Sequence, residues 1–155
     1  MISTVPRNFF IVSGTGEGYT PLNAFDAALG TSGIGDLNLV KVSSIVPPHC
    51  TRIEPQAIAP GTLIAIAYAA KTSTLHGEVI AAAVAVGLPE DETRAGVIME
   101  YSALGHKQEV EEIVITMAQK ALESRGLKIR SIESRAIEVK VEHDAVAAFA
   151  GVVLI

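Results

Sequence analysis

Short runs of apolar residues, separated by turn-forming residues, recur along the whole chain and predict a protein made mostly of strands. The first run, Phe9–Ser13, has the length of a short strand. It leads into the glycine-rich stretch Gly14–Gly18, which we expect to form a flexible loop because glycine is favoured where a chain turns. The pattern continues to the C-terminus, where Ala145–Ile155 is almost entirely apolar.

A helix is predicted directly after the glycine-rich stretch. Thr20 offers a side-chain oxygen for the N-cap, and Pro21 suits the first turn, where its missing N–H would have had no helical partner. Gly30 is suited to close the helix in a left-handed conformation. The apolar stripe that we expect to face the core consists of Leu22, Phe25 and Leu29.

The next predicted strand is Leu37–Ile45, which Pro47 and Pro48 end because proline cannot donate to a strand ladder. Alternation of side chains along this strand places Asn38 and Ser44 on the same side. Three further apolar runs follow, and the middle one is compatible with a strand or a helix because it is rich in alanine. These runs are Leu63–Ala70, Val79–Leu88 and Ala95–Tyr101.

The clearest helical periodicity lies in His106–Arg125, and Gly126 is placed to stop this second helix. Its expected apolar face consists of Val110, Ile113, Val114, Met117, Ala118, Ala121 and Leu122. Two strands, Leu127–Val141 and Ala145–Ile155, complete the chain. Two helices among many strands indicate a layered α+β domain, and 155 residues fit a single domain spanning 1–155.

The composition argues against several classes of partner and location. The net charge of −5 argues against nucleic acid or an anionic membrane surface as the main partner, since both require a basic footprint. The single cysteine, Cys50, cannot form an internal disulfide. No apolar run approaches the roughly 20 residues that span a bilayer, and 1–12 contains no signal-peptide apolar core, so we expect a cytoplasmic protein.

Most familiar site motifs are incomplete. The glycine-rich stretch lacks the third glycine of a dinucleotide fingerprint, where Tyr19 stands instead, and the four histidines show no metal-ligand spacing. We therefore expect neither a phosphate loop nor a metal site. The pair Ser43-Ser44 is unusual, because two hydroxyls interrupt an apolar run immediately before two prolines and buried hydroxyls need partners.

Three stretches resemble the pyruvoyl-dependent arginine decarboxylase family, and the likeness extends over nearly the whole chain. They are Glu17–Asp26 (EGYTPLNAFD), Asn38–Pro48 (NLVKVSSIVPP) and Gly96–Tyr101 (GVIMEY). The middle stretch, with its Ser-Ser-Ile-x-Pro-Pro core, is long enough to be specific.

The resemblance implies a proenzyme that cuts itself between Ser43 and Ser44. The Ser44 hydroxyl would attack the Ser43 carbonyl, and elimination would then leave a pyruvoyl group at the start of 44–155, separated from 1–43. Strain of about 1–3 kcal/mol and preorganised donors at the oxyanion are the means expected to promote this step. Asn38 matches the family asparagine linked to it. The pyruvoyl group would form a Schiff base with the substrate amine and act as electron sink, without PLP or metal.

The resemblance also assigns roles to residues outside the cut. Glu100 matches the family's catalytic glutamate, which returns a proton to carbon, and we expect burial to raise its pKa. Asp26 matches the aspartate that faces the substrate guanidinium. The positions Leu22, Gly35 and Leu37 match residues that line the substrate pocket.

The fold and assembly implied by the family are a four-layer αββα sandwich of mainly antiparallel strands, arranged as a homotrimer or a dimer of trimers with active sites at subunit boundaries. The implied function is conversion of L-arginine to agmatine and CO₂ in polyamine biosynthesis. Two alternatives stay open at this point. One is a pyruvoyl-dependent decarboxylase of histidine or aspartate, and the other is an uncleaved, non-catalytic homologue that acts as a binding or structural trimer.

Overall fold

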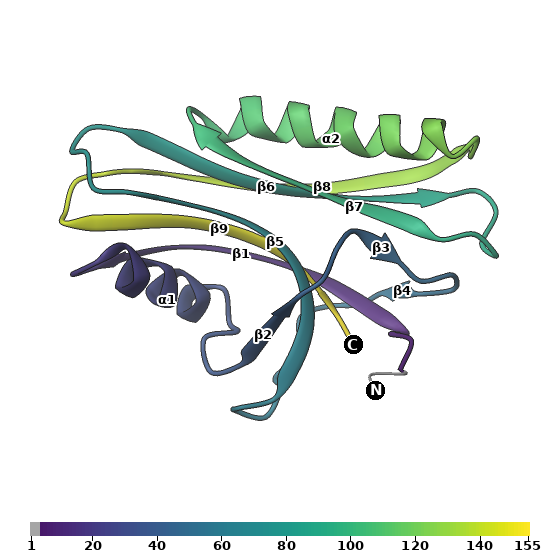
Figure 1. Ribbon diagram of the computed structural model, residues 1–155, viewed down its shortest axis with the longest axis horizontal. Helices are drawn as coiled ribbons and strands as arrows, with labels where there is room; N and C mark the ends of the chain where they lie inside the picture. Colours follow the sequence, from purple (N-terminus) through teal and green to yellow (C-terminus); the bar gives the residue numbers. More distant parts are fainter. Residues whose placement is uncertain (1–3) are drawn as a thin grey trace.

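A computed structural model describes residues 4–155, which form two helices and nine strands (Figure 1). In chain order the elements are β1 (Asn8–Gly18), α1 (Pro21–Thr31), β2 (Asn38–Lys41), β3 (Ile45–Val46), β4 (Thr51–Arg52), β5 (Leu63–Ser73), β6 (Val79–Pro89), β7 (Gly96–Leu104), α2 (Lys107–Ser124), β8 (Ile129–Lys140) and β9 (Ala145–Leu154). The predicted α+β class is confirmed, and the alanine-rich run Val79–Leu88 lies in a strand.

The strands form two sheets whose long neighbours run antiparallel. Sheet A has the order β2-β5-β9-β1-β4. Its two short edge strands are parallel to their neighbours, β2 to β5 and β4 to β1. Sheet B has the order β3-β7-β6-β8 and is antiparallel throughout. The strand of highest burial, β9, is the centre of sheet A and pairs with β1 and β5.

The elements are stacked in layers. Figure 1 shows α1 below sheet A, sheet B above sheet A, and α2 on the outer face of sheet B. Three apolar clusters fill the spaces between the layers, one between α1 and sheet A, one between the sheets and one between sheet B and α2. Alternate residues of each strand therefore face different layers, as in Val97 toward α2 and Ile98 toward sheet A.

The glycine-rich stretch is not a loop, and that prediction is wrong. It is the second half of β1, paired with β9 through Gly18↔Ala145. The glycines are required because α1 lies directly against them: a Cβ at Gly16 would lie 2.3 Å from the backbone N of Ala28. Closely similar contacts at Gly14 and Gly18 show that the absence of side chains lets the helix approach the strand.

Helix α1 begins as predicted and ends differently. The Thr20 side chain accepts a hydrogen bond from the Asn23 N–H at 3.2 Å, which confirms the N-cap. The helix continues through Gly30 to Thr31, and Gly33 takes the left-handed conformation at φ 83°. Its buried face consists of Ala24, Ala28 and Leu29. The expected stripe is therefore wrong at Leu22, whose side chain is 74% exposed.

The single strand predicted over Leu37–Ile45 is also wrong. The chain leaves sheet A after Lys41 and enters sheet B at Ile45, as Figure 1 shows where β2 continues up to β3. Hydrogen bonds mark both sides of the crossing: the Val42 N–H donates to the Ile66 carbonyl at 3.0 Å, and the Ile98 N–H donates to the Ser44 carbonyl at 2.8 Å. The stretch that the sequence predicts as one strand thus contributes to two sheets.

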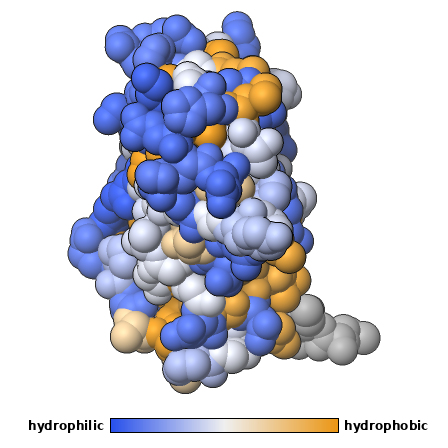
Figure 2. Space-filling model, turned by 90° about the vertical axis from the view of Figure 1, so that its left-hand side faces the viewer, coloured by the Kyte–Doolittle hydropathy of each residue, from blue (hydrophilic) through white to orange (hydrophobic). Residues whose placement is uncertain are grey.

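The second half of the chain agrees with the predicted elements. Helix α2 buries Val110, Val114, Ala118 and Leu122, while Ile113 is 42% exposed. Neither helix within residues 4–155 is long and apolar enough to span a membrane. Figure 2 shows the side of the molecule that lies on the left of Figure 1, where hydrophilic side chains predominate and hydrophobic patches are separate.

Candidate active site

The candidate site lies at an open edge of sheet A. Strand β2 pairs with β5 only as far as Lys41↔Ile66, so the continuation of β5 has no strand on that side. Side chains of β7, in sheet B, cover this edge instead. The Ser102 hydroxyl donates to the Ala70 carbonyl at 3.1 Å, and the Tyr68 backbone N–H hydrogen-bonds to the Glu100 carboxylate.

Glu100 has one paired and one unpaired oxygen. Its Oε1 lies 3.6 Å from the Lys41 Nζ, whereas Oε2 is buried and has no hydrogen-bond partner among residues 4–155. Burial raises the pKa of the Glu100 carboxyl, and the Lys41 ammonium and the Tyr68 N–H partly offset that rise. The direction agrees with the expectation from sequence, and a buried acceptor without a partner marks a place where a further polar group fits.

The Ser43–Ser44 bond lies beside Ile98 of β7, two residues before Glu100. Both residues belong to the segment that crosses between the sheets, outside any strand. The Ser44 carbonyl accepts from the Ile98 N–H at 2.8 Å, and Ile98 precedes Glu100 by two residues on the same face of β7. Two residues of a strand span about 7 Å, so the register brings the bond and the Glu100 side chain into one neighbourhood.

Asn38 is the first residue of β2, six residues before Ser44, and its side chain is hydrogen-bonded elsewhere. Its Nδ2 donates to the Gly61 carbonyl at 2.9 Å. The predicted alternation from Asn38 to Ser44 does not apply, because β2 ends at Lys41. Among non-glycine residues 4–155, positive φ occurs at His49 rather than at the serine pair, so the expected strain does not take that form at the bond.

The residues assigned to substrate binding lie on and after α1. Asp26 and Leu22 are exposed and lie four residues apart, hence on one face of the helix. Leu37 packs against the cluster beneath sheet A, and a Cβ at Gly35 would lie 2.8 Å from the Gly30 Cα. Among residues 4–155, no hydrogen bond or ion pair joins these positions to Glu100 or Ser44 within one chain.

The family model described as pyruvoyl-dependent arginine decarboxylase matches residues 8–154. The chain belongs to this family. A protein of that name from Methanococcus aeolicus is 45% identical over 149 residues, covering 96% of this chain and 90% of the relative.

Two other proteins named pyruvoyl-dependent arginine decarboxylase are also similar to this chain over most of its length. The protein from Methanocaldococcus jannaschii is 42% identical and covers 89% of this chain and 84% of its own length. The protein from Pyrococcus abyssi is 39% identical, with 97% and 96% coverage. The resemblance inferred from the three sequence stretches is therefore confirmed.

The sequence did not identify two residues of the candidate site, Lys41 and Tyr68. Lys41 contacts Glu100, and its Nζ lies 4.5 Å from the centre of the Tyr68 ring. Tyr68 in turn packs at 6.0 Å, ring centre to ring centre, against Phe25 of α1. Lys41 could have been noticed because its charge stands between two valines in a predicted strand. No local pattern distinguishes Tyr68 from a core residue.

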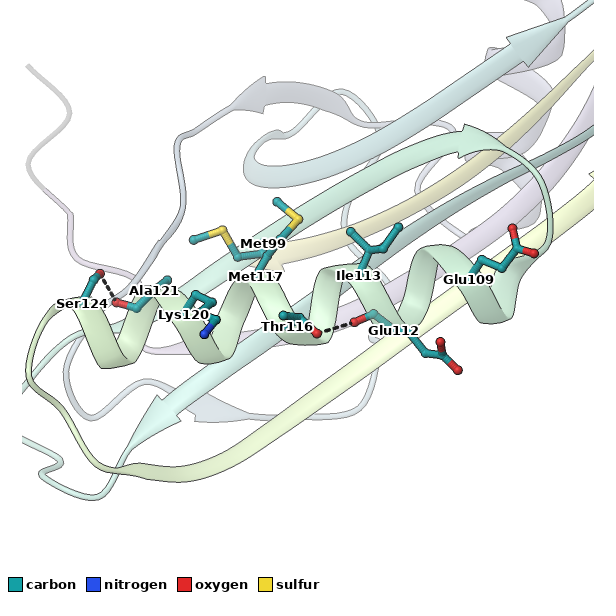
Figure 3. Close-up of a pocket in the computed structure, with 9 residues that line it drawn as sticks. All are labelled: Met99, Glu109, Glu112, Ile113, Thr116, Met117, Lys120, Ala121 and Ser124. Atoms are coloured by element: carbon teal, nitrogen blue, oxygen red, sulfur yellow. Dashed lines mark hydrogen bonds between the residues drawn. The ribbon is translucent and has the colours of Figure 1, made fainter.

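Other features of the molecule lie apart from this site. Figure 3 shows a groove where Met99, Ile113 and Met117 project between β7 and α2. Because Met99 and Glu100 are neighbours on a strand, they point to opposite faces of sheet B. Cys50 is buried, which raises the pKa of its thiol and disfavours the nucleophilic thiolate. No group of three or more potential metal-ligating side chains was found in the part of the chain that the structure describes.

Proposed function

We propose that this chain is the proenzyme of an arginine decarboxylase, which cuts itself between Ser43 and Ser44 and then converts L-arginine to agmatine and CO₂. The observation that carries the proposal is the position of the Ser43–Ser44 bond. It lies outside both flanking strands, in the segment that joins the sheets, next to the strand that carries Glu100. Family membership supports the same reaction.

The fold is suited to survive such a cut. The piece 1–43 contains β1, α1 and β2, and the piece 44–155 contains the remaining strands and α2. Strand β1 pairs with β9 from Phe9↔Leu154 to Gly18↔Ala145, so ten paired positions hold the pieces together. On either side of the bond, hydrogen bonds to Ile66 and Ile98 keep the new ends in place.

The cut proceeds through the chain's own atoms. The Ser44 Oγ attacks the Ser43 carbonyl carbon, the C–N bond breaks, and an ester joins the two residues while the Ser44 nitrogen becomes an amine. Loss of the Ser44 Cα proton then expels the Ser43 carboxylate and leaves dehydroalanine. Addition of water and loss of ammonia give the terminal ketone. Asn38 matches the family asparagine linked to this step, and its Nδ2 donates to the Gly61 carbonyl.

The residues present fit a pyruvoyl group at position 44, since the buried Oε2 of Glu100 has no partner among residues 4–155. When present, that group supplies an electron sink for the bonding electrons left by CO₂. Glu100 Oε2 holds the proton that the substrate carbon takes up, and the raised pKa keeps it protonated closer to neutral pH. This is a carboxy-lyase reaction that uses neither PLP nor metal.

Substrate recognition is assigned to α1 and the turn after it. Asp26 presents a carboxylate to the guanidinium, beside Leu22, Gly35 and Leu37. Because Asp26 and the 74% exposed Leu22 face away from their own core, a neighbouring subunit is expected to cover them. We infer a homotrimer or a dimer of trimers, built from four-layer αββα sandwiches, with active sites at subunit boundaries. The observed order of layers supports the sandwich.

Purified protein incubated with L-arginine tests the activity, with agmatine and CO₂ measured as products. Wild type should form both in equal amounts, and Ser44→Ala should form neither. Ser124→Ala is the matched control, because it removes an exposed hydroxyl at the end of α2 and should leave both products unchanged. A folded wild-type protein that forms no agmatine, or a preference for histidine or aspartate, would contradict the proposal. The product is a polyamine precursor, consistent with a role in polyamine biosynthesis.

A further inference from the structure

Lys41 is held by two separate contacts. Its Nζ lies 3.6 Å from Glu100 Oε1 and 4.5 Å from the centre of the Tyr68 ring. The ring is fixed in turn, since its centre lies 5.4 Å from that of the buried Phe149. An ammonium group between a carboxylate and the face of a fixed aromatic ring has a defined position, even though 52% of the Lys41 side chain is exposed.

Few charged groups belong to the elements on the side of β7 that Glu100 faces, because α2 packs on the opposite side. Strands β6 and β9, which pack against β7, carry no titratable side chain within their bounds. Strand β5 carries Tyr68 and Lys71, and β2 carries Lys41. Of these groups, Lys41 acts on the Glu100 carboxyl through its charge, across an ion pair of 3.6 Å.

We propose that Lys41 is a positioning residue, which orients the Glu100 carboxyl through Oε1 and leaves Oε2 free to carry the catalytic proton. This inference rests on the proposed function. After the cut, Lys41 belongs to the piece 1–43 and Glu100 to the piece 44–155. The ion pair therefore joins the two pieces at the point where the reaction takes place.

The charge of Lys41 lowers the pKa of the Glu100 carboxyl and so affects how activity depends on pH. The ammonium opposes the rise in the Glu100 pKa that burial causes. Without it, burial acts unopposed by that charge, and Glu100 stays protonated to higher pH. If the protonated carboxyl is the active form, activity falls as pH rises through its pKa. Removing Lys41 therefore moves this alkaline decline to higher pH.

The first arm of the test measures kcat/KM for arginine against pH in wild type, Lys41→Met and Lys41→Arg. Lys41→Met should lose activity near neutral pH and show its alkaline decline at higher pH. Lys41→Arg retains the cation and should keep the wild-type profile. Lys71→Met, which removes a lysine from β5, is the matched control and should also keep it. A lower rate in Lys41→Met with an unmoved decline would assign Lys41 a merely structural role and overturn the proposal.

The second arm does not depend on activity. In the uncut Ser44→Ala protein, the Glu100 carboxyl is titrated by NMR with ¹³C-labelled glutamate, and its signal is identified by its loss in Glu100→Gln. Adding Lys41→Met should raise the measured pKa, and adding Lys71→Met should not. An unchanged pKa in the Lys41 variant would refute the proposal. If wild type failed to decarboxylate arginine while this shift was present, the proposed function would fail and the Lys41–Glu100 coupling would stand.

Discussion

Substitution of Gly16 by alanine tests the contact between β1 and α1, which decides where the helix carrying Asp26 lies. A Cβ at Gly16 would lie 2.3 Å from the Ala28 N and 2.5 Å from the Ala24 carbonyl oxygen. Real Cβ atoms do not approach backbone so closely, so the helix or the strand must move. Overpacking of this kind costs about 1–3 kcal/mol of unfolding free energy, which corresponds to a fall in Tm of about 2–12 °C for a chain of this size.

Gly30 is the matched control. It lies within α1, is exposed, and a Cβ there would meet nothing within 4 Å. Gly30→Ala should therefore raise the unfolding free energy by about 0.5–1 kcal/mol, because alanine is the better helix former. Both variants are compared by urea and thermal unfolding in the Ser44→Ala background, where the chain stays in one piece. Equal stability of Gly16→Ala and Gly30→Ala would refute the close approach of α1 to β1.

Three further predictions concern catalysis. Glu100→Gln should still cut itself, but its kcat should fall by about 10²–10⁴, the usual effect of losing a general acid; near-normal turnover would assign the acid elsewhere. Wild-type activity should decline as pH rises, because the raised pKa of Glu100 marks where the protonated donor is lost, and an activity that only increases toward alkaline pH would exclude this role. Asp26→Asn should also cut itself yet lose about 10²–10⁴ in kcat/KM for arginine, since an unpaired guanidinium in a desolvated pocket costs about 3–5 kcal/mol. The measurement compares arginine with lysine at fixed salt, and unchanged arginine selectivity would remove Asp26 from the site.

The sequence allowed the helices and most long strands to be predicted, because their periodicity is local. Helix α2 and strand β9 were expected within a residue or two of their observed bounds. The stretch Gly14–Gly18 was misinterpreted, because glycine favours both a turn and close packing of a helix on a strand. Only the contact with Ala24 and Ala28 distinguishes the two, and that contact is tertiary.

The crossing between the sheets was hidden for a similar reason. The hydroxyls of Ser43 and Ser44 could equally mark a break in the strand or polar positions within it, so the pattern did not show where the chain leaves sheet A. The family resemblance identified Ser44 and Glu100, but the register that sets Ser44 beside Ile98, two residues before Glu100, became visible only in the structure. Lys41 and Tyr68 belong to the site through side-chain contacts that no spacing encodes.

The central claim is that the chain cuts itself between Ser43 and Ser44, and intact-mass spectrometry of the purified, denatured protein tests it most directly. Scaled by length from 16.2 kDa, the pieces 1–43 and 44–155 should have masses of about 4.5 and about 11.7 kDa, on the assumption of uniform residue mass. The larger piece should have a blocked N-terminus that reacts with hydrazine, and Ser44→Ala should show one uncut chain. A folded, wholly uncut wild-type protein that still decarboxylates arginine would contradict the account.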